Sequence, residues 1–481
     1  PSYNEEELDV TDYTYTYVGD NIQNPRFFIG RWPVRQIQDI LILKAKTIEH
    51  TKLEQAGNLN RFDDALVVAG NFKDGQGVQP WDWPVTPRWT SLWLQDELYE
   101  FGYDNVDTVF YHAQNYENGA SNPMIANSWN SGIGIVNYRG WGDANGWHYP
   151  EFHADDVQGL NNGWLTPVFM SYVCNSNDFA NSVDPCFSEA MLRGGTTSNP
   201  KGGVAFIGPS DLHTSTKYNN VINASMYDAM INHGVVELGP ALMAGQAGLV
   251  KEFPNQNEPG EAQEFYFHVY NILGDPSLQV YLDTPDNFSF TSNEVLSSDG
   301  YIQLKVLSSS GNPVEGAVIA VMNGAQLISK GITTEEGLFA VNLEMDNIAE
   351  LSVYANKAGF VQGKHSVVIQ PNSYHDLKLK NFTVINEAGT NIASFGSKIS
   401  ISMDIENLSS AAVSGFEASL AFNQGINPSN LTVQIPDISG QESVAITVDD
   451  LFIIGGNDYD HNVLAQLIDQ SGSNIFNMCL N

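Results

Sequence analysis

The chain has 481 residues, with 56 acidic against 21 basic side chains and a formal net charge of −35 at pH 7. Nucleic acids and anionic membranes need Lys and Arg opposite their phosphates, so this charge balance disfavours both as partners. No apolar run reaches the roughly 18 residues of a membrane-spanning helix. The length suits about two to four domains, and three cysteines do not make a disulfide framework.

The first part of the chain, residues 1–282, alternates apolar strand-like runs with amphipathic stretches. In the first helix, Ile37, Ile40 and Leu41 recur at near-helical spacing. Strands that alternate with helices predict an α/β domain with a mostly parallel sheet covered on both faces. The pattern predicts strands at 65–70, 106–111, 132–138, 166–174 and 202–208, and helices at 34–52, 91–102, 186–193, 217–233, 238–251 and 261–272.

The second part has a different pattern. A linker at 283–294 is followed by short alternating segments separated by turn residues about every ten positions, as in β-sandwiches. We predict two all-β sandwich domains, 283–375 and 376–481, and both resemble Ig-like modules. Neither carries a compact cluster of His, Asp or Glu. Surface or self-assembly contacts, or a spacer role, are therefore expected of them.

Candidate chemistry lies where two predicted strands end. One strand leads into Gly140-Trp141-Gly142, and the other ends at Cys174 and Asn175. Ligands of such sheets bind beyond the carboxyl ends of the strands. The amides of Gly142 and Cys174 could together stabilise an oxyanion. A lone cysteine at a strand end is nevertheless more often a small buried residue than a nucleophile.

Residues of about 12–282 resemble the catalytic domain of gingipain-type cysteine peptidases, family C25, which has a caspase-like fold. The resemblance is carried in order by YVGDNIQNPRFFIGRWPV, GIVNYRGWG, SYVCNSNDF, DPCFSEAMLR, GGVAFIGPS and LGDPSLQV. It implies that Cys174 is the nucleophile and that Cys186 is structural. It also implies an N-terminal part missing from this chain, and cargo of the type IX secretion route, secreted or on the outer-membrane surface of a Bacteroidetes-like bacterium.

One residue departs from the family pattern. The family carries Gly-His-Gly at the first loop, with the histidine as general base, whereas this chain has Trp141, which stands 33 residues before Cys174. The indole nitrogen only donates, so it cannot accept the thiol proton. We expect Trp141 and Asn175 to line the pocket instead.

Three histidines are candidates for the missing base. His148, in the loop after Trp141, is our first choice, and His153 and His213 are alternatives. Asp143, Glu151 or Asp155 could orient the imidazole. The other interpretation of His148 and His153 is that they only hydrogen-bond their own loop.

Substrate and metal preferences are less readable. The aromatic stretch 78–93 contains Arg88 and a single acid, Asp82, so specificity for Arg or Lys is not predicted. No cofactor is expected to be required. The family resemblance allows structural Ca²⁺, for which 178–184 and 456–460 are rich in oxygen ligands, but no Asp-x-Asp-x-Asp-Gly loop exists and metal ligands stay unassigned.

Two functions from different classes follow. The first is a secreted or cell-surface cysteine endopeptidase that hydrolyses protein or peptide substrates through the Cys174 thiolate. The alternative, favoured by Trp141, is a catalytically impaired surface protein, adhesin or filament-type structural protein that keeps the peptidase fold. A third hypothesis is a hydrolase or transferase that acts on non-peptide acyl groups through the same Cys174 nucleophile.

Overall fold

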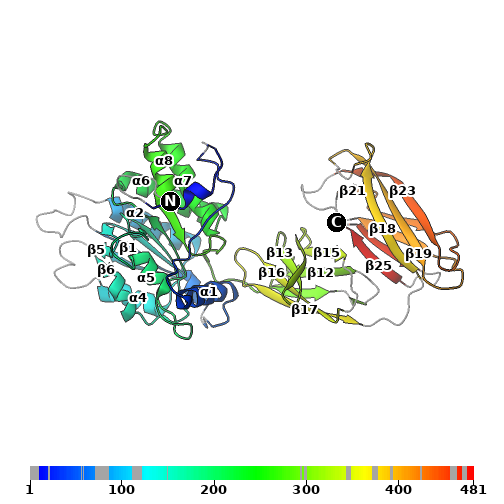
Figure 1. The fold of residues 1–481 in the computed structure, drawn as a ribbon, viewed down its shortest axis with the longest axis horizontal. Helices are drawn as coiled ribbons and strands as arrows, with labels where there is room; N and C mark the ends of the chain where they lie inside the picture. Colours follow the sequence, from blue (N-terminus) through cyan, green and yellow to red (C-terminus); the bar gives the residue numbers. More distant parts are fainter. Residues whose placement is uncertain are drawn as a thin grey trace, which may run out of the picture. The chain divides into compact units, whose positions relative to one another are not determined.

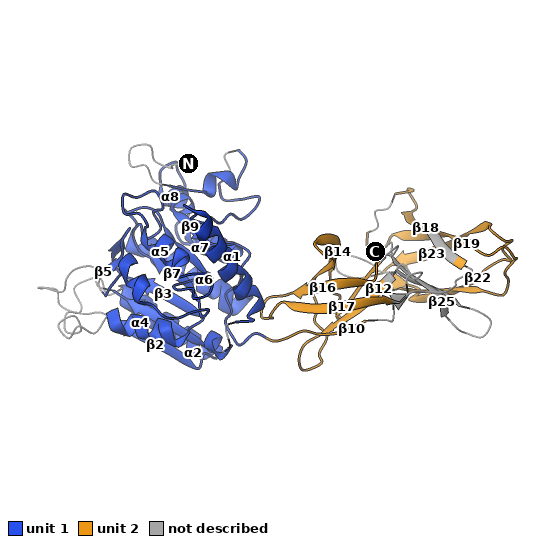
Figure 2. Cartoon of the chain, turned by 60° about the horizontal axis from the view of Figure 1, so that its bottom comes forward, with its two compact units in different colours: residues 1–285 blue, residues 286–481 orange. Residues whose placement is uncertain are grey.

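The structure is a computed structural model with two compact units, residues 1–285 and 286–481 (Figure 2). The predicted boundary at 282 lies three residues from the division between them. The residues it describes are 10–19, 22–55, 57, 59–70, 86–110, 122–148, 150–292, 295–296, 301–342, 348–370, 377–390, 394–422, 425–454, 463–468 and 474–480.

The first unit is built on a six-stranded sheet, which Figure 1 shows between helices. Five strands are parallel and β9 runs antiparallel to β8, so the predicted mostly parallel sheet is confirmed. In spatial order the strands are β2 (Asn105–Phe110), β1 (Asp64–Ala69), β3 (Ile135–Arg139), β7 (Val168–Tyr172), β8 (Ala205–Pro209) and β9 (Tyr270–Leu273).

Both faces of this sheet are covered. Alternate residues of β1 enter two different apolar clusters. Val67 packs in one with Met226 of α6 (Thr216–His233), and Leu66 packs in the other with Trp129 of α4 (Asn122–Ser131). This alternation is what a strand buried on both faces requires. The helices are α1 (Ile37–Lys52), α2 (Thr86–Phe101), α4 (Asn122–Ser131), α5 (Phe187–Arg193), α6 (Thr216–His233), α7 (Leu238–Glu252) and α8 (Ala262–Val269), with 3₁₀ turns η1 (Tyr13–Tyr15), η2 (Asn60–Asp63) and η3 (Ala154–Gly159).

The predicted helix over 261–272 is wrong in its last three residues. The helix α8 ends at Val269, and the next four residues form strand β9, paired with β8 from Phe206↔Leu273 to Pro209↔Tyr270. The apolar run continues through both elements, so periodicity could not mark the change. The pairing partner decides the structure of β9.

The outer edge of β9 is also occupied. The backbone N–H of Arg31 donates to the Ile272 carbonyl, and the N–H of Gly274 donates to the Arg31 carbonyl, each at 2.9 Å. Gly30 lies so close that an added Cβ would be 2.3 Å from the Gly274 carbonyl oxygen. The segment before α1 therefore lies along the last strand of the sheet.

Helix α1 does not bury the apolar positions that indicate it. Ile37, Ile40 and Leu41 are 76%, 42% and 46% exposed, whereas Lys46 is fully buried. The Lys46 ammonium donates to backbone carbonyls at the end of α5, including that of Leu192 at 2.7 Å. Burial lowers the pKa of Lys46 to about 7, and these carbonyls satisfy its buried amino group, so a polar contact fastens α1 to α5.

The second unit consists of antiparallel sheets, as the alternating segments predict, apart from the parallel pair β11–β17. It contains two separate apolar clusters, one within 302–369 and one within 377–453. The division into two sandwiches at 375 stays a prediction. The strands are β10 (Ser289–Ser292), β11 (Val295–Leu296), β12 (Tyr301–Leu307), β13 (Val318–Asn323), β14 (Gln326–Ile332), β15 (Leu338–Asn342), β16 (Glu350–Asn356), β17 (Gly363–Gln370), β18 (Leu377–Asn386), β19 (Lys398–Asn407), β20 (Glu417–Phe422), β21 (Ile426–Asn427), β22 (Asn430–Gln434), β23 (Ser443–Ile453), β24 (Val463–Ile468) and β25 (Asn474–Leu480).

Candidate active site

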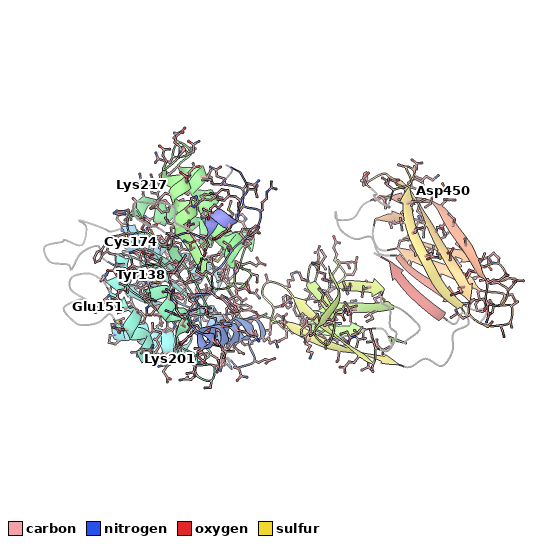
Figure 3. The ribbon with its side chains drawn as sticks, viewed as in Figure 1. Tyr138, Glu151, Cys174, Lys201, Lys217 and Asp450 are labelled. Atoms are coloured by element: carbon pink, nitrogen blue, oxygen red, sulfur yellow. The ribbon has the colours of Figure 1, made fainter. Side chains whose placement is uncertain are left out.

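The candidate site lies where two neighbouring parallel strands end. Strands β3 and β7 pair in register up to Arg139↔Tyr172. Because parallel strands end at the same edge of a sheet, the loop that begins at Gly140 and the turn that carries Cys174 emerge side by side. Figure 3 labels Tyr138, on β3, and Cys174 in this unit.

A small three-stranded sheet follows Trp141. Its strands β4 (Gly142–Asp143), β5 (Gly146–His148) and β6 (Glu151–His153) are antiparallel. Buried Trp147 anchors it, because its indole N–H donates to Ser171 Oγ at 3.0 Å and its ring stacks on Tyr138 at 4.3 Å between centroids. The hairpin is thus fixed to both strands that form the site.

Gly142 marks a close approach between this hairpin and the strand end. A Cβ at this position would lie 2.5 Å from the Gly146 carbonyl oxygen and 3.4 Å from Val173 Cγ1. Only glycine fits the first of these distances. Gly142 therefore lies beside the residue that precedes Cys174, as its expected oxyanion role requires, and that role stays a prediction.

His148 lies against Trp141. Its backbone N–H donates to the Trp141 carbonyl at 3.1 Å, and the two ring centroids are 4.6 Å apart. Its Nε2 is 2.8 Å from Asp143 Oδ2, and this hydrogen bond holds the pKa of the Asp143 carboxyl below its usual value. An imidazole with its own carboxylate thus lies next to the indole that replaces the expected histidine.

The two alternative histidines are placed differently. The His153 ring lies 5.0 Å from that of His148, and its Nδ1 is 3.7 Å from Glu151. The side chain of His213 is 67% exposed, with Nδ1 3.5 Å from Asp211. His148 and His153 therefore share one hairpin, and His213 lies on the loop after β8.

The Cys174 thiol is partly buried and free. The Thr214 hydroxyl donates to its Sγ at 3.6 Å, Asn219 donates to Thr214 at 3.1 Å, and the Tyr270 hydroxyl donates to Asn219 at 2.8 Å. Burial raises the pKa of the Cys174 thiol, and the Thr214 hydrogen bond opposes that shift. Sequence reasoning missed this polar chain, whose members no motif connects.

Asn175 joins the cysteine turn to the neighbouring loop. It is buried, and its N–H donates to the Asp211 carbonyl at 2.8 Å. Its φ of 20° lies at the border of the left-handed region, which Asn tolerates better than most residues. The second cysteine, Cys186, is buried before α5, and burial raises its pKa to about 12.

Several expectations lie apart from this site. Residues 78–85 and 456–460 fall outside the described residues, and Trp89 is 61% exposed. Asp178 accepts a hydrogen bond from Asn181 within its own loop. Across the described ranges, no group of three or more His, Cys, Asp or Glu side chains is arranged to hold a metal ion. Ca²⁺ binding stays a prediction.

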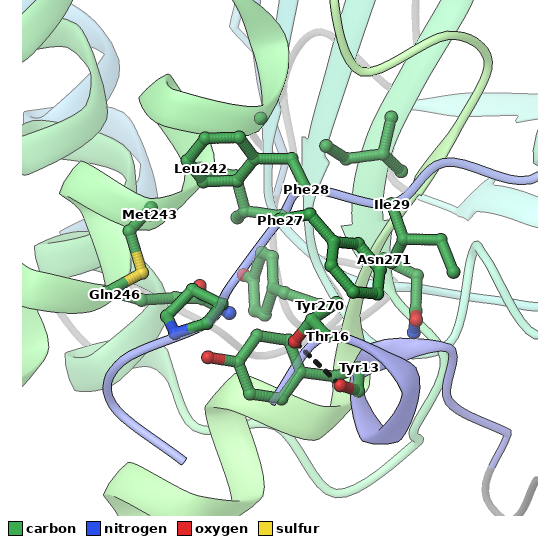
Figure 4. Close-up of a pocket in the computed structure, with 13 residues that line it drawn as sticks. Tyr13, Thr16, Phe27, Phe28, Ile29, Leu242, Met243, Gln246, Tyr270 and Asn271 are labelled. Carbon is green, nitrogen blue, oxygen red and sulfur yellow. Dashed lines mark hydrogen bonds between the residues drawn. The ribbon is translucent and has the colours of Figure 1, made fainter. Parts of the chain in front are cut away.

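A mainly apolar pocket is also present in the first unit (Figure 4). It is formed by the segment before α1 together with α7 and β9, and within the described residues its lining includes Tyr270 but neither Cys174 nor a histidine. Its labelled lining includes Tyr13, Phe27, Phe28, Leu242, Met243 and Tyr270. It is therefore a hollow distinct from the cysteine turn.

The fold is that of a known cysteine proteinase. The crystal structure of the Arg-specific cysteine proteinase gingipain R aligns with a TM-score of 0.64 at 19% identity, covering 75% of this chain and 80% of that chain. The complex of the gingipain pro- and mature domains from Porphyromonas gingivalis gives a TM-score of 0.62 at 20% identity, with 75% and 81% covered.

The family assignment follows from the sequence itself. The pattern of peptidase family C25 matches residues 1–281, more than half of the chain, so this chain belongs to that family. Gingipain R1 of Porphyromonas gingivalis is 24% identical over 342 residues, which are 68% of this chain and 32% of that protein. Lys-gingipain of the same species is 22% identical over 351 residues, 69% of this chain and 19% of that protein. The chain thus spans a third or less of the length of these two relatives.

In the part of the chain that the structure describes, no helix is both long and apolar enough to cross a membrane.

Proposed function

We propose that this chain is a cysteine endopeptidase in which Cys174 is the nucleophile and His148 replaces the family's histidine as general base. The observation that carries the proposal is the Asp143–His148 pair lying against Trp141, in the hairpin beside the cysteine turn. Membership of a peptidase family implies protein substrates. The loop departs from the family pattern because Trp141 stands where the family has a histidine. The imidazole of His148 lies next to the Trp141 ring.

In the proposed reaction, His148 takes the thiol proton and the Cys174 sulfur attacks the scissile carbonyl carbon. A C–S bond forms, and the carbonyl electron pair moves to oxygen, where the amides of Gly142 and Cys174 would stabilise it. Collapse breaks the C–N bond, and the leaving amine takes the proton from His148. Water then adds to the thioester carbon and gives a proton to His148. Collapse breaks the C–S bond and releases the acid, and the departing sulfur takes the proton back from His148.

The test is hydrolysis of fluorescently labelled casein by the full chain. Cys174→Ala is expected to abolish it, while Cys186→Ala, at the buried structural thiol, should retain it. His148→Ala should lower kcat/KM by about 10²–10⁴-fold, the usual contribution of a general base. If His213→Ala shows this loss of kcat/KM and His148→Ala does not, His213 is the general base instead.

The second candidate function is a catalytically impaired surface protein. Two observations favour it: Trp141 cannot accept a proton, and burial raises the pKa of the Cys174 thiol. It predicts that iodoacetamide labels Cys174 no faster than free cysteine and that casein stays intact. Rapid labelling together with casein cleavage would exclude it.

We further propose that the chain is exported to the cell surface through the type IX route and that its second unit forms two Ig-like modules that serve as spacers or contact surfaces. The support is the family resemblance together with the antiparallel sheets and two apolar clusters of that unit. Protease shaving of intact cells, followed by mass spectrometry, would detect surface-exposed peptides. Their absence, with the protein retained inside the cells, would contradict export.

A further inference from the structure

Arg139, the last residue of β3, is a buried cation beside the candidate site; its exposed fraction is 1%. Its guanidinium donates to Asn220 Oδ1 from Nε at 3.1 Å, to the Thr216 carbonyl at 3.2 Å and to the Tyr172 carbonyl. All three acceptors are neutral. Among the described residues, no carboxylate forms an ion pair with Arg139, and a buried charge without a counter-ion is costly.

The acceptors of the Arg139 hydrogen bonds belong to the segments that also position the Cys174 thiol. Tyr172 pairs with Arg139 across the strands and precedes Cys174 by two residues. Thr216 begins α6 and follows by two residues Thr214, the donor to Cys174 Sγ. The guanidinium thus lies between the strand end that carries the sulfur and the loop that donates a hydrogen bond to it. Burial lowers the pKa of Arg139 and raises that of Cys174, and the attraction between the guanidinium and the thiolate opposes both shifts.

The other titratable groups that act on this thiol do not provide a positive charge. Tyr138 from β3, Tyr266 from α8 and Tyr270 from β9 have pKa values raised by burial, so they are neutral at pH 7. The side chain of Asp211, from the loop after β8, acts in the opposite sense to Arg139 and raises the pKa of the Cys174 thiol. Among these groups of the described residues, Arg139 is therefore the one that attracts the thiolate.

We propose that Arg139 is a positioning residue that acts as the permanent counter-charge of the Cys174 thiolate. This inference deepens the proposed function and rests on Cys174 being its nucleophile. In a cysteine–histidine pair the imidazolium provides the positive charge and also carries the proton. Here the two tasks are divided: Arg139 balances the charge and His148 handles the proton. Burial lowers the pKa of Arg139, but a guanidinium starts so far above neutral pH that the counter-charge persists where an imidazolium would lose its proton.

The experiment measures how fast iodoacetamide alkylates Cys174 in the full chain from pH 5 to 10, with the labelled residue identified by mass spectrometry. The thiolate displaces iodide, so the rate follows the thiolate fraction. In Arg139→Met, the midpoint is expected to move upward by about one pH unit, a roughly tenfold slower rate at pH 7. Arg139→Lys keeps the charge and should retain most of the rate.

Arg61 provides a matched control. It is also buried, donates to the Ile133 carbonyl at 3.0 Å, and interacts electrostatically with Tyr281 and Glu49. Arg61→Met is expected to leave the midpoint unchanged, because this cation is not coupled to the thiol. An Arg139→Met midpoint equal to that of the wild-type chain would overturn the proposal.

If Arg139→Met does not fold, Asn220→Asp replaces it. The aspartate keeps an acceptor oxygen where Asn220 Oδ1 lies but provides Arg139 with a competing carboxylate, so the midpoint should again rise. Asn232→Asp, on the same helix and bonded to Asp228, is the control. An unshifted midpoint in Asn220→Asp overturns the inference. Normal alkylation without casein cleavage would contradict the proposed function alone, because alkylation requires no peptide chemistry.

Discussion

The Nε2 atom of His148 lies 2.8 Å from Oδ2 of Asp143, within the hairpin that begins directly after Trp141. A carboxylate accepts hydrogen bonds, so we expect it to favour the tautomer with the proton on Nε2 and the lone pair on Nδ1. On this assignment Asp143 selects the nitrogen of His148 that takes a proton.

Asp143→Asn tests this relationship. The amide can donate to Nε2 and thereby favour the wrong tautomer, so kcat/KM for casein is expected to fall about 10–100-fold. Glu151→Gln is the control, since Glu151 is 62% exposed and lies 3.7 Å from His153. Equal losses in both variants would show that the hairpin responds to any lost charge, contrary to our assignment.

Thr214→Val tests the hydrogen bond to the sulfur. The change preserves shape but removes the hydroxyl that stabilises the thiolate, so the Cys174 pKa should rise. Alkylation at pH 7 is expected to slow by about fivefold to tenfold. Thr51→Val, which removes a hydroxyl that donates to the Thr47 carbonyl in α1, should not alter that rate. A normal rate in Thr214→Val would contradict the role of this bond.

Gly142→Ala tests the close approach of the hairpin. The new Cβ would lie 2.5 Å from a backbone oxygen, so the hairpin must shift. We expect a loss of about 1–3 kcal/mol in the free energy of unfolding and at least a tenfold loss of casein hydrolysis. Gly159→Ala is matched, because its Cβ would meet nothing within 4 Å. The idea fails if Gly142→Ala behaves like Gly159→Ala.

Stability should depend on pH through His50. Its Nε2 lies 2.8 Å from the Gln279 carbonyl oxygen, and burial lowers its pKa from 6.5 to about 4. Below pH 6.5 the unfolded chain therefore binds a proton that the folded chain excludes, and stability falls as the pH falls toward 4. At pH 5 this one group should cost about 2 kcal/mol relative to pH 7.

Urea unfolding at pH 5 and pH 7 provides the measurement for His50. All nine tryptophans lie in the first unit, so their fluorescence reports on that unit alone. His50→Gln keeps a donor for the Gln279 carbonyl and should reduce the pH dependence, while His233→Gln, at an exposed histidine, should not. An unchanged pH dependence in His50→Gln would refute the assignment.

The sequence predicts the sheet well because buried parallel strands are short apolar runs, such as 65–70, and amphipathic helical stretches separate them. It fails where a neighbour decides the structure. Strand β9 continues an apolar helix and becomes a strand because β8 offers it a pairing edge. Likewise, the thiol's surroundings join Cys174 to Thr214 and Tyr270, and no local pattern connects positions so far apart in the chain. The significance of Trp141 is recognised only by comparison with the family pattern, which has a histidine at this position.

The contact of Arg31 with β9 has a consequence for aggregation. An exposed final strand offers unpaired N–H and C=O groups on which a foreign strand can add. At Ile272 and Gly274 those groups are already bound by the chain's own backbone. The chain thereby keeps this border of its own sheet closed to foreign strands at these two positions.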